Sequence, residues 1–227
     1  MKSSYYQDFL YPWQDKILSL IMKLDLPFYL TGGTALSRHY LSHRYSDDLD
    51  FFVNSHPDFR RLIKVIEDQF TQGKIIYHAL TRGDDFVRFE VVSNDNISLK
   101  LDFVNDQVIH CGGFEQSSIL GRVDNVMNIL SNKISAIPRL EIKDFADIVC
   151  IARKYRFEWE KLIGEAMQKD AWVNPLDFAS YMVEADSKRF EMIQWIGEVD
   201  LVKMEQDSRI IADDVVLGRH NSLADSL

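Results

Sequence analysis

Two aspartates separated by one residue, Asp48 and Asp50, precede a short apolar run, Phe51–Val53. If this segment is a strand, both carboxylates project from one face, about 6.6 Å apart at roughly 3.3 Å per residue. Such a pair can bind one or two Mg²⁺ ions. Without a cation it is unfavourable, because two charges ~5 Å apart at an effective dielectric of roughly 20 repel by about 3 kcal/mol. The alternative is a turn cap beside a solvated carboxylate, but the apolar run favours a central strand, where unpaired carboxylates are costly.

Asp102 is a third candidate carboxylate. Apolar and polar residues alternate strictly over residues 97–104, so a strand there places Asp102 on its polar face beside Lys100. Taken alone, an aspartate in this position is expected to be solvated. It becomes a candidate third metal ligand or general base because the first two carboxylates need a partner.

A glycine pair, Gly32-Gly33, separates an apolar segment at residues 28–30 from a helical pattern at residues 35–41, which Thr34 is placed to open. Backbone N–H groups at such a turn can bind the phosphates of a nucleotide, and Thr34 would add a hydroxyl donor. The alternative interpretation is a tight turn with no ligand.

Two further groups of polar residues could serve a bound triphosphate. Arg44 and Ser46 lie just before the aspartate pair, where they would orient the carboxylates, touch a phosphate or form an ordinary surface turn. Lys133 lies beside an apolar helical stripe and could either snorkel to solvent or reach a triphosphate. Asp144 and Asp147 share a helix face and could contact the sugar of a nucleotide, hold Lys133 or pair with Lys143.

Composition indicates an ordinary soluble protein. The chain has 227 residues, 46% of them hydrophobic, enough for one large domain or two small ones. The net charge of −9 argues against a broad nucleic-acid footprint but leaves a local basic groove open. Two cysteines in ordinary contexts fit a reducing cytoplasm, and no apolar run approaches the ~20 residues of a membrane span.

Hydrophobic periodicity predicts an α+β fold, a mixed sheet of about five strands with flanking helices, followed by a helical part. We expect the division at residues 1–112 and 113–227, with the second part contributing to the active-site cleft. The last twenty or so residues are polar and weakly patterned, which predicts an irregular tail. The predicted helices are 13–24, 35–41, 57–70, 126–137, 141–155, 157–168, one opened by Asn174-Pro175 and 188–196; the later strands are 74–81, 86–93 and 97–104.

The segment GGTALSRHYLSHRYSDDLDFF resembles the signature of the nucleotidyltransferase-like AbiEii/AbiGii toxin family, a branch of the polymerase-β-type nucleotidyltransferases. The later segment NKISAIPRLEIKDFADIVCI is similar to a second signature of that family. The resemblance covers about residues 25–155. The matching positions are Gly32, Gly33, Thr34, Arg44, Ser46, Asp48 and Asp50 in the first signature, and Lys133, Arg139, Lys143, Asp144 and Asp147 in the second.

The resemblance implies two-metal transfer of NMP from an NTP to an acceptor such as tRNA or protein. Asp48 and Asp50 would hold Mg²⁺ on the triphosphate, and Asp102 would complete a second metal site or activate the acceptor hydroxyl. Gly33 and Thr34 would cradle the leaving pyrophosphate, with Lys133 neutralising its charge. Members of the family act as toxins paired with an antitoxin, so a cognate antitoxin is an expected partner.

Two other functions are compatible with parts of the sequence. A non-catalytic relative could keep the fold and bind a nucleotide or a protein partner, although the presence of all three carboxylates counts against it. A metal-dependent nuclease could be built on Asp102 with Glu141 and Lys143. Such a Glu-x-Lys pair belongs on a strand, whereas Pro138 and the pattern after it predict a helix start here.

Overall fold

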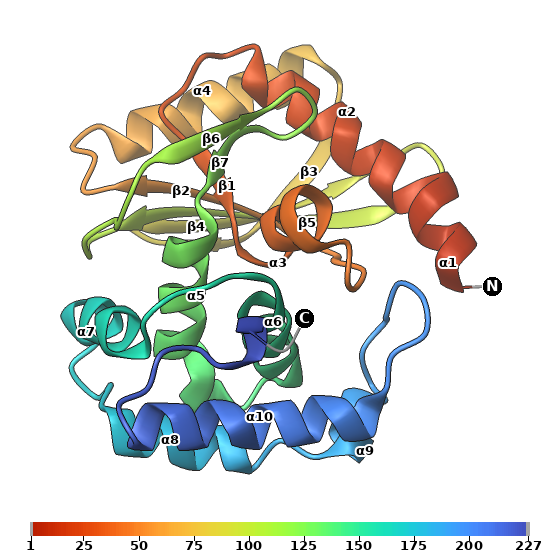
Figure 1. Cartoon of the computed structure of the whole chain (residues 1–227). Coiled ribbons are helices and arrows are strands. Elements are labelled where there is room, and N and C mark those ends of the chain that lie inside the picture. The colour runs from red at the N-terminus through yellow and green to blue at the C-terminus, as the bar shows by residue number, and fades with distance from the viewer. Residues whose placement is uncertain (1, 226–227) are drawn as a thin grey trace. The chain divides into compact units, whose positions relative to one another are not determined.

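The chain divides into two compact units, Met1–Asn125 and Val126–Leu227. The computed structural model describes residues 2–225 (Figure 1). The boundary between the units lies further along the chain than the expected division at residues 112 and 113. The reason is that residues 114–124 form two strands that join the sheet of the first unit. Each unit therefore has its own core.

A mixed seven-stranded sheet of strand order β3-β4-β5-β2-β1-β7-β6 forms the first unit. β2 pairs in parallel with β5, and β1 with β7, while the other neighbours are antiparallel. The α+β class is confirmed, but the expected strand number of about five was too low. The strands are β1 Tyr29–Thr31, β2 Leu49–Asn54, β3 Ile76–Arg82, β4 Phe86–Val92, β5 Ser98–Asp106, β6 Phe114–Ser117 and β7 Gly121–Asp124.

One face of this sheet is covered by α2 (Tyr11–Met22) and α4 (Phe59–Gln72), as Figure 1 shows. On that face Phe103 is fully buried, with its ring stacked on Phe51 at 5.0 Å and edge-on to Phe89 at 5.9 Å. Burial of each such side chain contributes about 1.5–3 kcal/mol. Because strand residues alternate, this packing directs the residues between them to the opposite face.

Helical structure also precedes and follows the glycine turn. Before α2 the chain forms α1 (Lys2–Tyr5) and a π-helical segment η1 (Tyr6–Leu10). After β1 it forms α3 (Gly32–Ala35), continued by the π-helical η2 (Leu36–Leu41). The expectation that Thr34 opens this helix is wrong, because Thr31 occupies the N-cap position and Thr34 lies inside the first turn.

The second unit is helical. Asn174 caps α8 as predicted, since its side chain accepts a hydrogen bond from the backbone N–H of Asp177. The helix expected over residues 188–196 is only a short turn, α9. In chain order the elements are α5 Val126–Ala136, η3 Ile137–Arg139, α6 Ile142–Lys154, α7 Trp159–Lys169, α8 Pro175–Val183, α9 Ser187–Phe190, α10 Leu201–Val216 and η4 Leu223–Asp225.

The expectation of an irregular tail over the last twenty or so residues is wrong for its first part, because α10 spans Leu201–Val216. Three of the positions on its buried stripe are polar, Asp207, Ser208 and Asp214, so hydrophobic periodicity did not reveal the helix. Asp207 is compensated by Arg153, whose Nε donates to it at 2.7 Å. Ser208 donates to the carbonyl of Met182 at 2.6 Å. A buried polar group that finds a partner can thus occupy a core position of a helix.

Within residues 2–225, no helix is long and apolar enough to cross a membrane.

Candidate active site

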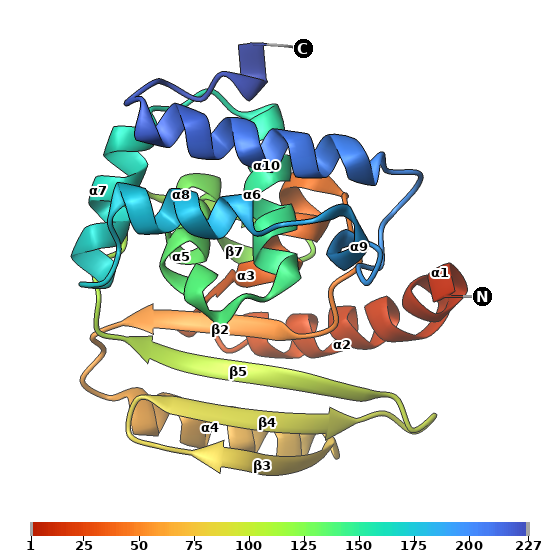
Figure 2. The same cartoon turned by 90° about the horizontal axis from the view of Figure 1, so that it is seen from below.

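Strand register brings one polar row together across four strands of the first unit. Thr31 on β1 faces Asp50 on β2, Asp50 faces Asp102 on β5, and Asp102 faces Arg88 on β4. Figure 2 shows β2, β5 and β4 side by side in that order. Facing residues of paired strands share a face of the sheet, so these side chains lie on the side opposite α2 and α4. The pairing of Asp50 with Asp102 brings together two of the three carboxylates that the sequence singled out.

Arg88 was not among the predicted site residues. Its Nε and Nη2 donate to the two carboxylate oxygens of Asp102 at 2.7 and 2.6 Å. The pKa of Arg88 is raised above its ordinary value, first by this hydrogen bond and also by the negative charges of Asp102, Asp48 and Asp50. The field of all three carboxylates therefore reaches one guanidinium.

The sequence contained a signal for Arg88. The turn that joins β4 to β5 is centred on Asp95, with Arg88 seven residues before it and Asp102 seven residues after it. In an antiparallel hairpin, residues equidistant from the turn face each other. The register of this hairpin was therefore readable from the position of its turn.

The glycine turn contacts the carboxylate row. Gly32 has a φ of +69°, and a Cβ at this position would overlap the carboxylate of Asp50. A Cβ at Gly33 would lie 2.6 Å from Nη2 of Arg44 and 3.0 Å from Oγ of Ser46. Both glycines are therefore required for close approach, one to a carboxylate and the other to two polar side chains. Gly32, Gly33, Arg44, Ser46 and Asp50 form one cluster.

Thr34 has a different position from the one expected of a phosphate ligand. It is fully buried, and its hydroxyl donates to the backbone carbonyl of Asp48 at 2.5 Å. Ser37 makes a similar bond to the carbonyl of Arg44. Both hydroxyls thus fix the backbone around the loop that leads into β2.

A second set of residues supports this loop from the N-terminal helices. Gln14 is fully buried, and its Nε2 lies 3.1 Å from the carbonyl oxygen of Ser46 and 3.2 Å from that of Asp47. The hydroxyl of Tyr6 donates to the Asp47 carboxylate at 2.7 Å, and its ring stacks on Tyr45 at 4.2 Å. Burial, together with the Asp47 contact, raises the pKa of Tyr6. A glutamine in the apolar stripe of α2 was the available sequence signal.

The row continues onto β7 through Asp124, which the sequence analysis also missed. Thr31 Oγ1 donates to Asp124 Oδ2 at 2.6 Å, and His110 Nε2 lies 2.8 Å from Asp124 Oδ1. Asp124 is fully buried. This carboxylate therefore anchors the end of β1 next to the glycine turn.

In the second unit, Lys133 is held by the two aspartates of the second signature. Its Nζ lies 2.6 Å from Asp144 Oδ1 and 2.9 Å from Asp147 Oδ2. The lysine side chain is 14% exposed, and those of Asp144 and Asp147 are 11% and 0% exposed. Of the three predicted roles for these aspartates, the structure shows the contact with Lys133, and a contact with the sugar of a nucleotide stays a prediction. Glu141 is the N-cap of α6 and Lys143 lies within that helix, so the nuclease interpretation lacks its strand.

Hard oxygen donors at Asp48 and Asp50 fit Mg²⁺, which commonly binds through one or two carboxylates together with substrate phosphates. Among residues 2–225, no cluster of three or more histidine, cysteine, aspartate or glutamate side chains is arranged to hold a metal ion. Asp102 is engaged by Arg88, so a second ion at Asp102 requires this guanidinium to move. The donor chemistry of Asp48 and Asp50 fits Mg²⁺, and the expectation of two ions stays a prediction.

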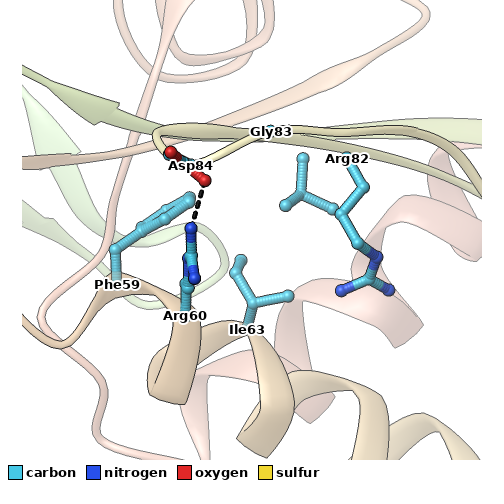
Figure 3. A pocket seen from close by; sticks show the side chains of 7 residues that line it. Phe59, Arg60, Ile63, Arg82, Gly83 and Asp84 are labelled. Atoms are coloured by element: carbon cyan, nitrogen blue, oxygen red, sulfur yellow. Dashed lines mark hydrogen bonds and ion pairs between the residues drawn. The ribbon is translucent and has the colours of Figure 1, made fainter.

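A cavity of about 300 Å³ lies elsewhere, between α4 and the turn that joins β3 to β4 (Figure 3). Val87 lines it, and because Val87 and Arg88 are adjacent in a strand they point to opposite faces. Figure 3 also shows the ion pair between Arg60 and Asp84 at this cavity. The cavity is therefore on the helix-covered side and is separate from the carboxylate row.

Solved structures share this fold. MenT4, a nucleotidyltransferase toxin of Mycobacterium tuberculosis H37Rv, is similar with a TM-score of 0.65 and 19% identity over 95% of this chain and 86% of the toxin chain. JHP933 from Helicobacter pylori is similar with a TM-score of 0.58 and 20% identity over 93% of this chain and 92% of that one. At these identities the likeness establishes the fold class, that of nucleotidyltransferase toxin structures. No curated protein gives a significant match.

The family model for AbiEii, described as a nucleotidyl transferase toxin of a type IV toxin–antitoxin system, matches residues 20–213. The chain belongs to this family and is a nucleotidyltransferase. The family membership predicted from the two motifs is confirmed.

Proposed function

We propose that this protein transfers NMP from a Mg²⁺-bound NTP to an acceptor hydroxyl, as the toxin of a toxin–antitoxin pair. The observation that carries the proposal is the facing pair Asp50 and Asp102, with Gly32 against the Asp50 carboxylate. A carboxylate pair beside a glycine turn is suited to hold a triphosphate and its metal while a phosphorus–oxygen bond is exchanged.

Asp48 and Asp50 would hold Mg²⁺, which supplies charge neutralisation and polarisation of the phosphate oxygens when bound. The backbone at Gly32 and Gly33, with Arg44 and Ser46 beside it, would bind the pyrophosphate portion. The acceptor oxygen forms a bond to the α-phosphorus while the bond to the bridging oxygen breaks, and pyrophosphate leaves. The Thr34 and Gln14 hydrogen bonds would keep the loop before Asp50 in one geometry.

Asp102 would take the acceptor proton or complete a second metal site. The bidentate contact with Arg88 holds its two oxygens in a fixed orientation. Lys133 remains a predicted neutraliser of the triphosphate, and Asp144 and Asp147 hold it in position. An NTP substrate and a chain with only two cysteines, Cys111 and Cys150, support action in the cytoplasm.

The proposal is tested by incubating the protein with each of four labelled NTPs, Mg²⁺ and either total RNA or total protein. We expect label to enter one acceptor class with one preferred NTP. Asp48→Asn and Asp50→Asn should each lower the rate at least about a hundredfold. Absence of transfer from all four NTPs to both acceptors would contradict catalysis, and RNA nicking with Mg²⁺ alone would favour the nuclease alternative.

The second candidate function is a non-catalytic nucleotide- or partner-binding module. The observation in its favour is the Asp102–Arg88 ion pair, which occupies the third carboxylate. Calorimetric titration with NTP, together with a transfer assay, separates the two functions, because a binding module would bind NTP without turnover. Co-purification with a protein that suppresses toxicity would support the antitoxin partner under either function.

A further inference from the structure

An apolar row lies next to the carboxylate row on the same face of the sheet. Phe52 on β2 faces Val104 on β5, and Val104 faces Phe86 on β4. Each lies two residues along its own strand from Asp50, Asp102 or Arg88, so the side chains project to the same side. Tyr29 on β1 faces Phe52, with 6.3 Å between their ring centroids, and completes the row.

This row is only partly covered. Phe52, Val104 and Phe86 are half-buried, whereas Phe51 and Phe103, their neighbours on the helix-covered face, are buried. The exposed part of these two phenylalanine rings lies beside charged residues and is available to an apolar partner. The guanidinium of Arg88 lies 5.5 Å from the centroid of the Phe86 ring, which adds a planar cation to the platform.

The directions of β1 and β2 place this apolar row on the side of the carboxylate row from which the acceptor would approach. Thr31 faces Asp50 and Tyr29 faces Phe52, so the chain that leaves β1 at Gly32 runs away from Phe52. Along the strands the order is therefore glycine turn, carboxylate row, apolar row. In-line displacement at phosphorus places the attacking and leaving oxygens on opposite sides. If pyrophosphate leaves toward the glycine turn, the acceptor hydroxyl enters from the side of Phe52, Val104 and Phe86.

We propose that Phe52, Val104 and Phe86 stack the terminal, unpaired base of an RNA acceptor, so that the acceptor is a single-stranded RNA end and not a protein side chain. This inference rests on the proposed function, because it uses the direction of in-line transfer. Bases of any sequence can stack on aromatic rings, since every base has a flat π face. Arg88 would serve the same base through its planar guanidinium while it holds Asp102.

The kinetic test uses single-stranded RNA oligonucleotides that end in a normal or an abasic 3′ nucleotide. Phe52→Leu and Phe86→Leu keep apolar volume but remove the rings, and each should lower kcat/KM for normal RNA at least about tenfold. The KM for NTP should stay unchanged. The abasic RNA should be a poor substrate for the wild type, with no further loss in either variant. Phe86→Trp, which keeps a ring, should retain activity, and Phe9→Leu, at an exposed ring outside the row, is the matched control.

A binding measurement separates failure of this inference from failure of the proposed function. RNA with 2-aminopurine at its 3′ end should lose fluorescence on binding to the wild type and to Asp50→Asn, and the loss should be smaller with Phe52→Leu. This readout needs no catalysis. Three outcomes would overturn the inference. One is equal quenching in the wild type and all variants. The others are a ring variant that raises the KM for NTP but not the KM for RNA, and label transfer to protein alone.

Discussion

Arg88 and Asp102 form a bidentate ion pair with nitrogen–oxygen distances of 2.7 and 2.6 Å. Asp102 faces Asp50 on the neighbouring strand. The side chain of Asp102 is 15% exposed and that of Arg88 is 41% exposed. The guanidinium therefore stands at the solvent side of a carboxylate that is itself largely covered. Any cation that binds Asp102 must compete with Arg88.

Arg88→Gln should tighten Mg²⁺ binding in the presence of NTP. Removal of the guanidinium leaves one more unit of negative charge beside the Asp48–Asp50 pair. For a divalent ion ~6 Å away in a water-like dielectric, that charge is worth about 1.4 kcal/mol, or roughly tenfold in the Mg²⁺ concentration for half-saturation. Calorimetric Mg²⁺ titration with NTP measures the shift. Arg60→Gln, which breaks the exposed pair with Asp84, is the control, and an equal shift in both variants would contradict the expectation.

Gly32→Ala should destabilise the protein and abolish activity. A left-handed φ costs a residue with a Cβ about 1–2 kcal/mol, and the new Cβ would overlap the Asp50 carboxylate. We expect the free energy of unfolding to fall by about 1–3 kcal/mol in urea melts. Gly164→Ala is the matched control, because Gly164 lies inside α7 with no neighbour within 4 Å of an added Cβ. That change should leave stability equal or raise it by up to about 1 kcal/mol.

The site was predictable where it depended on local spacing. Asp50 lies in β2 and faces Asp102, and the glycines directly follow β1, so their close approach followed from strand and turn geometry. Asp48 lies one residue before β2, so the shared face of the two aspartates stays a prediction. Thr34 was expected to donate to a phosphate, whereas its hydroxyl donates to the carbonyl of Asp48. One hydroxyl can serve a ligand or a backbone carbonyl, and the sequence does not decide between them. Gln14 was missed because a glutamine in the apolar stripe of α2 indicates a buried polar group but does not indicate which distant carbonyls it binds.

The fold was predictable where hydrophobic periodicity was strong. β5 alternates strictly and was placed within two residues at each end, whereas β6 is short and mostly exposed, so no strand was predicted there. α10 was taken for tail because Asp207 and Asp214 occupy buried positions on it. Asp214 accepts hydrogen bonds from the backbone N–H and the hydroxyl of Ser222, a residue beyond the helix. A hydrogen-bond partner from another part of the fold thus allows a polar residue to be buried in a helix, and hydrophobic periodicity does not reveal such a position.

Gln14→Leu should reduce both stability and turnover. The change leaves the carbonyls of Ser46 and Asp47 without their buried donor, a loss of about 1–3 kcal/mol. The loop before Asp50 should then relax, so kcat should fall while the fold persists by circular dichroism. Gln168→Leu is the control, because Gln168 donates only to a helix carbonyl at the surface. Unchanged kcat in Gln14→Leu would show that the loop needs no support from α2.

Stability should fall steeply above pH 10 because of Tyr29. Burial raises the pKa of Tyr29 far above its ordinary value of 10.0, and the charges of Asp124 and Asp106 add to the effect. The phenol then stays neutral in the folded chain while the unfolded chain loses its proton. The contribution of the neutral Tyr29 phenol to the free energy of unfolding is complete below pH 10. Above pH 10 it is lost at up to about 1.4 kcal/mol per pH unit. Urea melts between pH 9 and 11 measure this slope, which Tyr29→Phe should reduce and Tyr5→Phe, at an exposed ring, should leave unchanged.

Lys133→Met should separate a structural role of Lys133 from its predicted catalytic role. The change removes the cation from two covered carboxylates, Asp144 and Asp147, which should lower the free energy of unfolding by about 3–5 kcal/mol. Adding Asp144→Asn and Asp147→Asn to the same chain removes the uncompensated charges and should restore most of this stability. Nucleotidyl transfer per folded molecule then decides between the roles, because a purely structural lysine predicts that activity returns with stability. We expect the triple variant to be stable and inactive. Recovery of transfer in that variant would contradict a direct role of Lys133 at the triphosphate.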